Sequence, residues 1–267
     1  MSFTAKDVMQ LRKATGLGMA DCKKALEKAE GDLDKAAEIV RAEFGAKMDG
    51  RADRESGEGR IAIAVADDKS KGAIVRVNTE TDFTAKNDAF VAMTQKVADL
   101  ALDQEPGDVA ANDTIEDTLK EVRLTTGENI QFGSGTVYGG AGHTVGSYVH
   151  FTGKVGVLID LEGQADEQLC KDLCMHISAI VPEPMGVNEE DVPADIIEKE
   201  KQAAKAEAIE SGKPEDIAEK MVVGKMRKYM DSIVLLRQPF VKDDKQQIQD
   251  ILPEGVKIKS FTKLAIG

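Results

Sequence analysis

Apolar and polar positions alternate with different periods along the chain, and the changes of period divide it into segments. In residues 4–44 apolar side chains recur every three to four positions, and glycine-containing breaks divide this stretch into three predicted helices. Thr4 can cap the first helix together with the aspartate three residues later. Cys22 falls on the apolar side of the second helix with Ala25 and Leu26. A bundle of about 40 residues buries only a small core, so part of its apolar surface is available to a partner.

The middle of the chain predicts two similar units of strands and helices. Apolar runs at 61–66 and 73–79 predict two strands, and helices are predicted at about 88–102 and, more weakly, at 114–126. The segments "SYVHF" and "KVGVLIDLEG", followed by "DEQLCKDLCMHISAI", repeat the order strand, strand, helix. The sequence therefore predicts an α+β fold with two core subdomains, each built on an antiparallel sheet.

Two charge-rich helical segments follow, separated by "SGKP", where Gly212 can end one helix and Pro214 can begin the next. Their apolar positions are few, which predicts a helical hairpin that projects as a coiled-coil arm. The chain then returns as a strand, a helix and a final strand. The predicted division is a three-helix module at 1–45, a glycine-rich charged linker at 46–60, a first core subdomain at 61–129, a second at 130–187 with 232–267, and the hairpin at 188–231.

Charge and composition narrow the classes of function. The formal net charge of −13 argues against direct binding to nucleic acid, because phosphate backbones attract basic surfaces. No apolar run reaches the roughly 18 residues of a membrane span, and the first residues lack the apolar stretch of a signal peptide. Three cysteines form an odd and sparse set, which favours a reducing cytoplasm over a disulfide framework.

Two stretches have some features of a nucleotide-binding loop or a metal site, but each lacks a residue that such a site requires. The glycine-rich segment 132–147 lacks the lysine of a phosphate-binding loop, so we expect a flexible loop before a strand. Cys170 and Cys174 lie one helical turn apart, but His176 projects elsewhere and no fourth ligand is evident, so buried structural thiols are favoured over a metal site. The sequence predicts no cofactor and no metal. Catalytic partners that meet only in space stay open.

The segment "NTETDFTAKND", between a predicted strand and a predicted helix, places a large apolar ring at a position where small polar residues are usual. Two interpretations are open. Asp82 can cap the helix while Phe83 turns into its own core. Alternatively, Phe83 is presented on a rigid turn to enter a pocket of a partner, because interface anchors are often aromatic.

Longer stretches resemble a known family. "LRKATGLGMADCKKALEKAEGDLDKAAEIVR" and "VNTETDFTAKNDAF" are similar to the two signature stretches of the bacterial elongation factor Ts family. "GSYVHFTGKVGVLI" and "SGKPEDIAEKMVVGKM" resemble its later segments. The order of the modules agrees over nearly the whole chain.

The resemblance implies a nucleotide exchange factor that binds elongation factor Tu with GDP, drives GDP out and leaves when GTP enters. It implies a ubiquitin-associated-like (UBA-like) bundle, two core subdomains and a coiled-coil arm, with no bond-making catalysis of its own. It also implies a cytoplasmic protein, and a homodimer in a two-to-two complex is one arrangement it allows. The residues that it places at the interface with elongation factor Tu are Arg12, Met19, Cys22, Lys23, Thr81, Asp82, Phe83 and His150.

The sequence departs from the family at Ala20, where some members carry a second methionine after Met19, which makes this contact smaller. Two other classes of function compete with exchange. One is an interaction module whose bundle binds other helices or ubiquitin-like folds, and the other is an enzyme that uses the cysteine and histidine helix. Removal of residues 1–50 would abolish the binding of a simple module, whereas an exchange factor would keep its Asp82–Phe83 turn and bind weakly.

Overall fold

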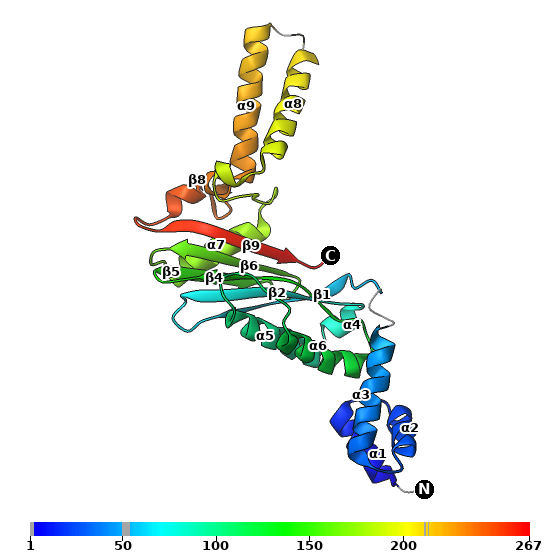
Figure 1. Cartoon of the computed structure of the whole chain (residues 1–267). Coiled ribbons are helices and arrows are strands. Elements are labelled where there is room, and N and C mark those ends of the chain that lie inside the picture. The colour runs from blue at the N-terminus through cyan, green and yellow to red at the C-terminus, as the bar shows by residue number, and fades with distance from the viewer. Residues whose placement is uncertain (1–2, 50–53, 211, 213) are drawn as a thin grey trace.

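The computed structural model describes residues 3–49, 54–210, 212 and 214–267. Figure 1 shows a small helical bundle at the N-terminal end, a layered body of sheets and helices, and a helical hairpin that projects from the opposite side of the body. The predicted α+β class is confirmed, because antiparallel sheets and helices together form the body.

The bundle contains α1 (Ala5–Thr15), α2 (Met19–Lys28) and α3 (Leu33–Asp49). The predicted cap at Thr4 is confirmed: its hydroxyl accepts from the backbone N–H of Asp7, and the Asp7 carboxylate accepts from the N–H of Thr4. The third helix runs to Asp49, past the predicted start of the linker at residue 46. The rest of the predicted linker falls partly on residues 50–53, which lie outside the described part of the chain.

Four strands among the described residues form the first sheet, in the order β1, β2, β4, β3. They are β1 (Glu58–Val65), β2 (Lys71–Thr79), β4 (Gln131–Gly139) and β3 (Gly107–Asp108). Each pairs antiparallel with its neighbour. Three helices belong to the same part of the chain: α4 (Asp82–Ala85), α5 (Asp88–Leu102) and α6 (Asp113–Thr126). The last two match the helices predicted at 88–102 and 114–126.

The second sheet has the order β5, β6, β9, and its neighbours are also antiparallel. Its strands are β5 (His143–Val149), β6 (Val155–Glu162) and β9 (Lys257–Ala265), and α7 (Glu167–Ala179) follows β6. The order strand, strand, helix therefore occurs twice, as β1–β2–α5 and as β5–β6–α7, and in both units the helix packs on its own strands. The repeat predicted from the pattern is confirmed at this level.

The two sheets pack face to face. α5 and α6 cover the outer face of the first sheet (Figure 1), and α7 covers the outer face of the second. Alternation along the strands produces this arrangement, because successive side chains of a strand point to opposite faces. On β2, Ile74 points to the second sheet, whereas Ala73 and Val75 point to α5 and α6. On β6, Leu158 points to the first sheet, and Val157 and Ile159 point to α7.

The flexible loop expected at 132–147 is wrong, because this segment forms most of β4 and β5. Its glycines allow close packing: a Cβ at Gly135 would lie 2.8 Å from the carbonyl oxygen of Ile74, and one at Gly146 would lie 2.8 Å from the Cβ of Cys170. β4 also pairs with β2 of the first sheet, although the predicted second subdomain begins at residue 130. That boundary therefore does not coincide with the division between the sheets.

The hairpin consists of α8 (Ala194–Glu210) and α9 (Glu215–Ile233), with Pro214 at the N-cap of α9. Ala204 and Ala208 are buried, whereas Ile209 is 77% exposed. Short elements then lead back to β9: η1 (Glu189–Asp191) precedes the hairpin, and η2 (Leu235–Arg237), β7 (Pro239–Phe240), β8 (Asp243–Gln247) and η3 (Ile248–Ile251) follow it. Within the described residues, no helix combines the length and apolar character needed to span a bilayer.

Candidate functional site

The turn between β2 and α5 contains a single helical turn, α4, that places its residues on two faces. Thr81 is the N-cap, and its hydroxyl accepts from the backbone N–H of Thr84 at 3.3 Å. Thr84 and Ala85 are buried, whereas the Phe83 side chain is 83% exposed. The interpretation in which Phe83 turns into its own core is therefore wrong. The predicted helix cap at Asp82 is wrong as well: Thr81 is the N-cap, and Asp82 occupies the first helical position.

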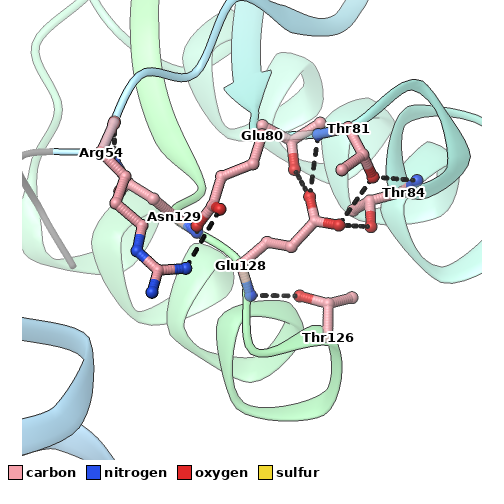
Figure 2. A network of polar contacts seen from close by, with 8 residues as sticks. Arg54, Glu80, Thr81, Thr84, Thr126, Glu128 and Asn129 are labelled. Carbon is pink, nitrogen blue, oxygen red and sulfur yellow. Dashed lines mark hydrogen bonds and ion pairs between the residues drawn. The ribbon is translucent and has the colours of Figure 1, made fainter.

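The carboxylate of Glu128, in the loop between α6 and β4, accepts hydrogen bonds from this turn (Figure 2). Its Oε2 accepts from the Thr79 hydroxyl at 2.7 Å and from the Thr81 backbone N–H at 3.1 Å. Its Oε1 accepts from the hydroxyls of Thr81 and Thr84, both at 2.7 Å. Four donors thus converge on one carboxylate, and the residues that supply them lie on both sides of Phe83.

The ionised form of Glu128 is favoured at this position. Burial by itself raises the pKa of Glu128, but the hydrogen bonds from Thr81, Thr84 and Thr79 together outweigh burial and lower the pKa from its ordinary value. A carboxylate that accepts several hydrogen bonds in a partly buried position stays charged because the donors replace water. Glu128 is therefore an anion at neutral pH and accepts all four hydrogen bonds.

A second set of contacts ties the same two segments together. Glu80 Oε1 accepts from the backbone N–H of Asn129 at 2.7 Å, and Glu80 Oε2 forms an ion pair with Arg54 at 3.3 Å. The Asn129 side-chain amide in turn donates to the carbonyl oxygen of Arg54 at 2.8 Å (Figure 2). These polar contacts fix the backbone of the Phe83 turn on the side that faces the protein. The Phe83 ring projects from the turn into solvent.

Asp82 lies beside Phe83 and pairs with Lys86 at 2.6 Å. The hydrogen bond from Lys86 is the main cause that lowers the pKa of Asp82, and the charge of Lys154 lowers it further. Lys154 also forms an ion pair with Glu58 at 2.7 Å. Because Lys154 belongs to the loop between β5 and β6, these charges bring that loop to the same end of the sheets as the Phe83 turn.

The loop between β5 and β6 carries His150, the candidate from the second half of the chain. The loop is anchored to β1 by the backbone N–H of Ile61, which donates to the carbonyl oxygen of Gly153 at 2.8 Å. The Nδ1 of His150 lies 2.8 Å from the Thr152 hydroxyl. The neighbouring Phe151 side chain is 88% exposed, so the loop presents a second aromatic ring to solvent.

Three of the candidates in the N-terminal bundle, Arg12, Met19 and Lys23, are exposed on α1 and α2. Met19 is the first residue of α2, and Gly18 is its N-cap. Met19 and Lys23 line a shallow groove of about 410 Å³, and its other lining residues are Phe3, Thr4, Ala5, Val8 and Ala20.

The structure does not support a direct contact for Cys22, the fourth candidate of the bundle. Its side chain is 0% exposed and lies in the core with Leu11 and Leu26. The thiol lies 3.8 Å from the carbonyl oxygen of Leu17, to which it donates. Cys22 therefore belongs to the core of the bundle, as expected from its place on the apolar face of the helix.

The C-terminal end of α6 and the loop after it lie between the N-terminal bundle and the Phe83 turn. Gly16 has a φ of +72°, and a Cβ at this position would overlap the side chain of Thr125. α3 also contacts α6. Glu128 lies three residues after Thr125, so the end of α6 and the loop after it contact the bundle on one side and hold the Phe83 turn on the other.

The cysteines and the histidine of α7 are buried in the core of the protein. Cys170 and Cys174 are buried, and burial raises the pKa of both thiols. His176 is buried as well, and its nitrogens contact Gln238 Oε1 at 3.1 Å and the Val241 backbone N–H at 3.3 Å. Within the residues that the structure describes, no three His, Cys, Asp or Glu side chains are grouped so that they could hold a metal ion.

Two residues of this region were not found from the sequence. Glu128 carries no local signal, because its partners are 44 to 49 residues away along the chain. The pattern of "SYVHF" predicts Phe151 at the end of a strand, but β5 ends at Val149 and Phe151 lies in the following turn. Gly153, which lies between this segment and the next apolar run, is the available signal for a turn.

Comparison with known proteins identifies the family of this chain. The family model described as Elongation factor TS matches residues 80–267, more than half of the chain. Elongation factor Ts of Alkalilimnicola ehrlichii is 42% identical over 275 aligned residues, which cover 100% of this chain and 93% of that protein. Elongation factor Ts of Halorhodospira halophila is also 42% identical with the same coverage, and that of Aquifex aeolicus is 36% identical, with 100% and 99% covered. The chain therefore belongs to the elongation factor Ts family.

Proposed function

We propose that this chain binds the GTPase elongation factor Tu in its GDP form and accelerates the release of GDP. Asp82 and Phe83 enter the GTPase domain near its magnesium and phosphate site. The observation that carries the proposal is the Phe83 ring, 83% exposed on a turn whose inner face is held by Glu128. Interface anchors are often aromatic, and a ring presented on a held turn suits insertion into a pocket of a partner.

The energetics of exchange fit such an arrangement. GDP is held largely by contacts to its phosphates and by magnesium, which balance its negative charge. Binding energy gained over a wide surface can be used to distort that site. By linkage, a factor that weakens GDP binding is itself weakened by GDP to the same degree, and a coupling of about 3 kcal/mol corresponds to about 150-fold. No bond is made or broken, so the proposal requires no catalytic residue.

The other contacts divide between two surfaces. In the bundle, Arg12, Met19 and Lys23 offer charge and flexible apolar surface around the groove, and flexible methionines suit adaptable contacts. In the body, His150 lies on the loop beside the Phe83 turn. The net charge of −13 favours a protein partner over direct contact with nucleic acid. The proposed role places the chain in the cytoplasm, and a two-to-two complex stays a prediction that light scattering of the complex can test.

The test is the release of a fluorescent GDP analogue from purified elongation factor Tu, with the wild-type chain and with Phe83→Ala. We expect strong acceleration by the wild type. Loss of an aromatic anchor costs about 2 kcal/mol or more, so we expect the variant to lose about 30-fold or more. Val241→Ala is the matched control, since it shortens an exposed apolar side chain between β7 and β8, away from α4 (Figure 1).

The outcomes separate the function from the anchor. Equal acceleration by wild type and Phe83→Ala would keep exchange and remove the role of the ring. Binding of elongation factor Tu without any acceleration by the wild type would leave an interaction module without exchange activity.

A further inference from the structure

We propose that Glu128 is a positioning residue for exchange: its carboxylate fixes the turn that carries Phe83, so that the ring is already oriented when the GTPase arrives. The inference deepens the proposed function and rests on it. Glu128 itself is the second residue after α6 and is not among the residues expected at the interface. It acts through Phe83.

The number of hydrogen bonds that Glu128 accepts matches the capacity of a carboxylate. Two oxygens with four lone-pair sites receive four donors: the hydroxyls of Thr79, Thr81 and Thr84, and the backbone N–H of Thr81. An ionised Glu accepts at every site, whereas a Gln has one acceptor oxygen and an NH2 group that donates. Glu128→Gln preserves the size of the side chain, but its NH2 group would face either the Thr81 backbone N–H, which can only donate, or two threonine hydroxyls that would have to turn and accept.

The position of the donors explains how one residue sets the direction of the ring. Thr81 lies two residues before Phe83 and Thr84 lies one residue after it, so the turn is held on both sides (Figure 2). The Phe83 side chain is too exposed for its own packing to fix it. The direction in which the side chain leaves the turn is therefore set by the backbone of α4, which Glu128 holds through Thr81 and Thr84. A group fixed before binding loses less conformational entropy on binding.

The loop that carries Glu128 is itself held in place. The backbone N–H of Glu128 donates to the Thr126 hydroxyl at 3.4 Å, and the next residue, Asn129, is fixed by Glu80 and Arg54. The carboxylate thus projects from a supported loop toward the turn. The same loop follows the end of α6 that contacts the N-terminal bundle, so the two surfaces proposed to bind the GTPase share one support.

The test is a double-mutant cycle between Glu128 and Phe83 in the full chain, measured as the acceleration of GDP release from elongation factor Tu. We expect Glu128→Gln to reduce the maximal release rate about tenfold in the wild-type background. We expect less than a twofold further effect in the Phe83→Ala background, because the ring that it positions is already absent. Glu121→Gln, which removes the same charge from the exposed face of α6, is the matched control and should leave the rate unchanged.

A second variant keeps the test valid if Glu128→Gln unfolds. Thr84→Val removes one donor with nearly the same shape, and we expect a smaller loss that again disappears in the Phe83→Ala background. Equal losses in both backgrounds would show that Glu128 supports the fold in general and would overturn the inference. Full activity of folded Glu128→Gln would also overturn it. Absence of acceleration by the wild type would overturn the proposed function and this inference together.

Discussion

The ring of Phe151 lies 4.3 Å from the ring of His150, measured between centroids, with an angle of 43° between the ring planes. Phe151 is thus the neighbour that covers one side of the histidine while most of its own surface faces solvent. If the loop between β5 and β6 meets the GTPase through His150, the phenylalanine ring enters the same contact. The pair then forms a second aromatic contact beside the Phe83 turn.

We therefore predict that Phe151→Ala weakens the complex with elongation factor Tu about fivefold to thirtyfold, as for loss of an aromatic interface residue worth 1 to 2 kcal/mol. Thermal stability should change by less than about 0.5 kcal/mol, because the side chain is exposed. Isothermal titration calorimetry gives the affinity, and a thermal melt gives the stability. Phe151→Tyr keeps the ring and should bind like the wild type. An affinity of Phe151→Ala equal to that of the wild type would place the loop outside the interface.

Cys22 and Lys23 are adjacent on α2, but substitution of Cys22 should change the stability of the protein, whereas substitution of Lys23 should change its binding. Cys22→Ala removes a buried thiol from the core of the bundle, so we predict a loss of stability of about 1 kcal/mol with little change in GDP release. Lys23→Ala removes an exposed charge from the groove, so we predict weaker binding with unchanged stability. Urea unfolding and titration with elongation factor Tu measure both quantities for both variants. Weaker binding by Cys22→Ala at unchanged stability would instead place the thiol at the interface.

The contrast between these two neighbours shows what periodicity can predict. The apolar spacing of α2 places Cys22 with Ala25 and Leu26, and all three are buried. The family resemblance alone placed Cys22 near the partner, because resemblance locates a motif and does not say which of its side chains face outward. The same periodicity located α5 within a residue, since Asn87 caps it and apolar positions recur regularly along it.

Long-range contacts explain what the sequence could not provide. Glu128 accepts hydrogen bonds from the turn that carries Phe83, and no local pattern connects a carboxylate to three threonines more than 40 residues away. The glycines of β4 and β5 suggested a loop because glycine is depleted in strands. In the fold they are required where a neighbouring strand or helix approaches closely, as at Gly135 and Gly146. These requirements belong to the packed structure and are visible only there.

His176 should make stability depend on pH. It is buried on α7, and its Nδ1 accepts from the Val241 N–H, so the neutral ring carries its proton on Nε2, which donates to Gln238 Oε1. Burial lowers the pKa of His176 below its ordinary value of 6.5, and the contact with Gln238 opposes this only in part. In the unfolded chain the histidine takes up a proton near that ordinary value, whereas in the folded chain it stays neutral to lower pH.

The sign follows from this difference. The unfolded state binds more protons than the folded state between the two pKa values, so the free energy of unfolding falls as pH decreases through this window. Well above pH 6.5 the contribution of His176 is complete and constant. We predict that the difference in stability between wild type and His176→Gln, measured by urea unfolding at pH 8.5, 7.5 and 5.5, is nearly constant at the two higher values and smaller at the lowest. Each unit by which the pKa is lowered corresponds to about 1.4 kcal/mol. A difference that stays the same at all three pH values would show that His176 titrates alike in the folded and unfolded chain.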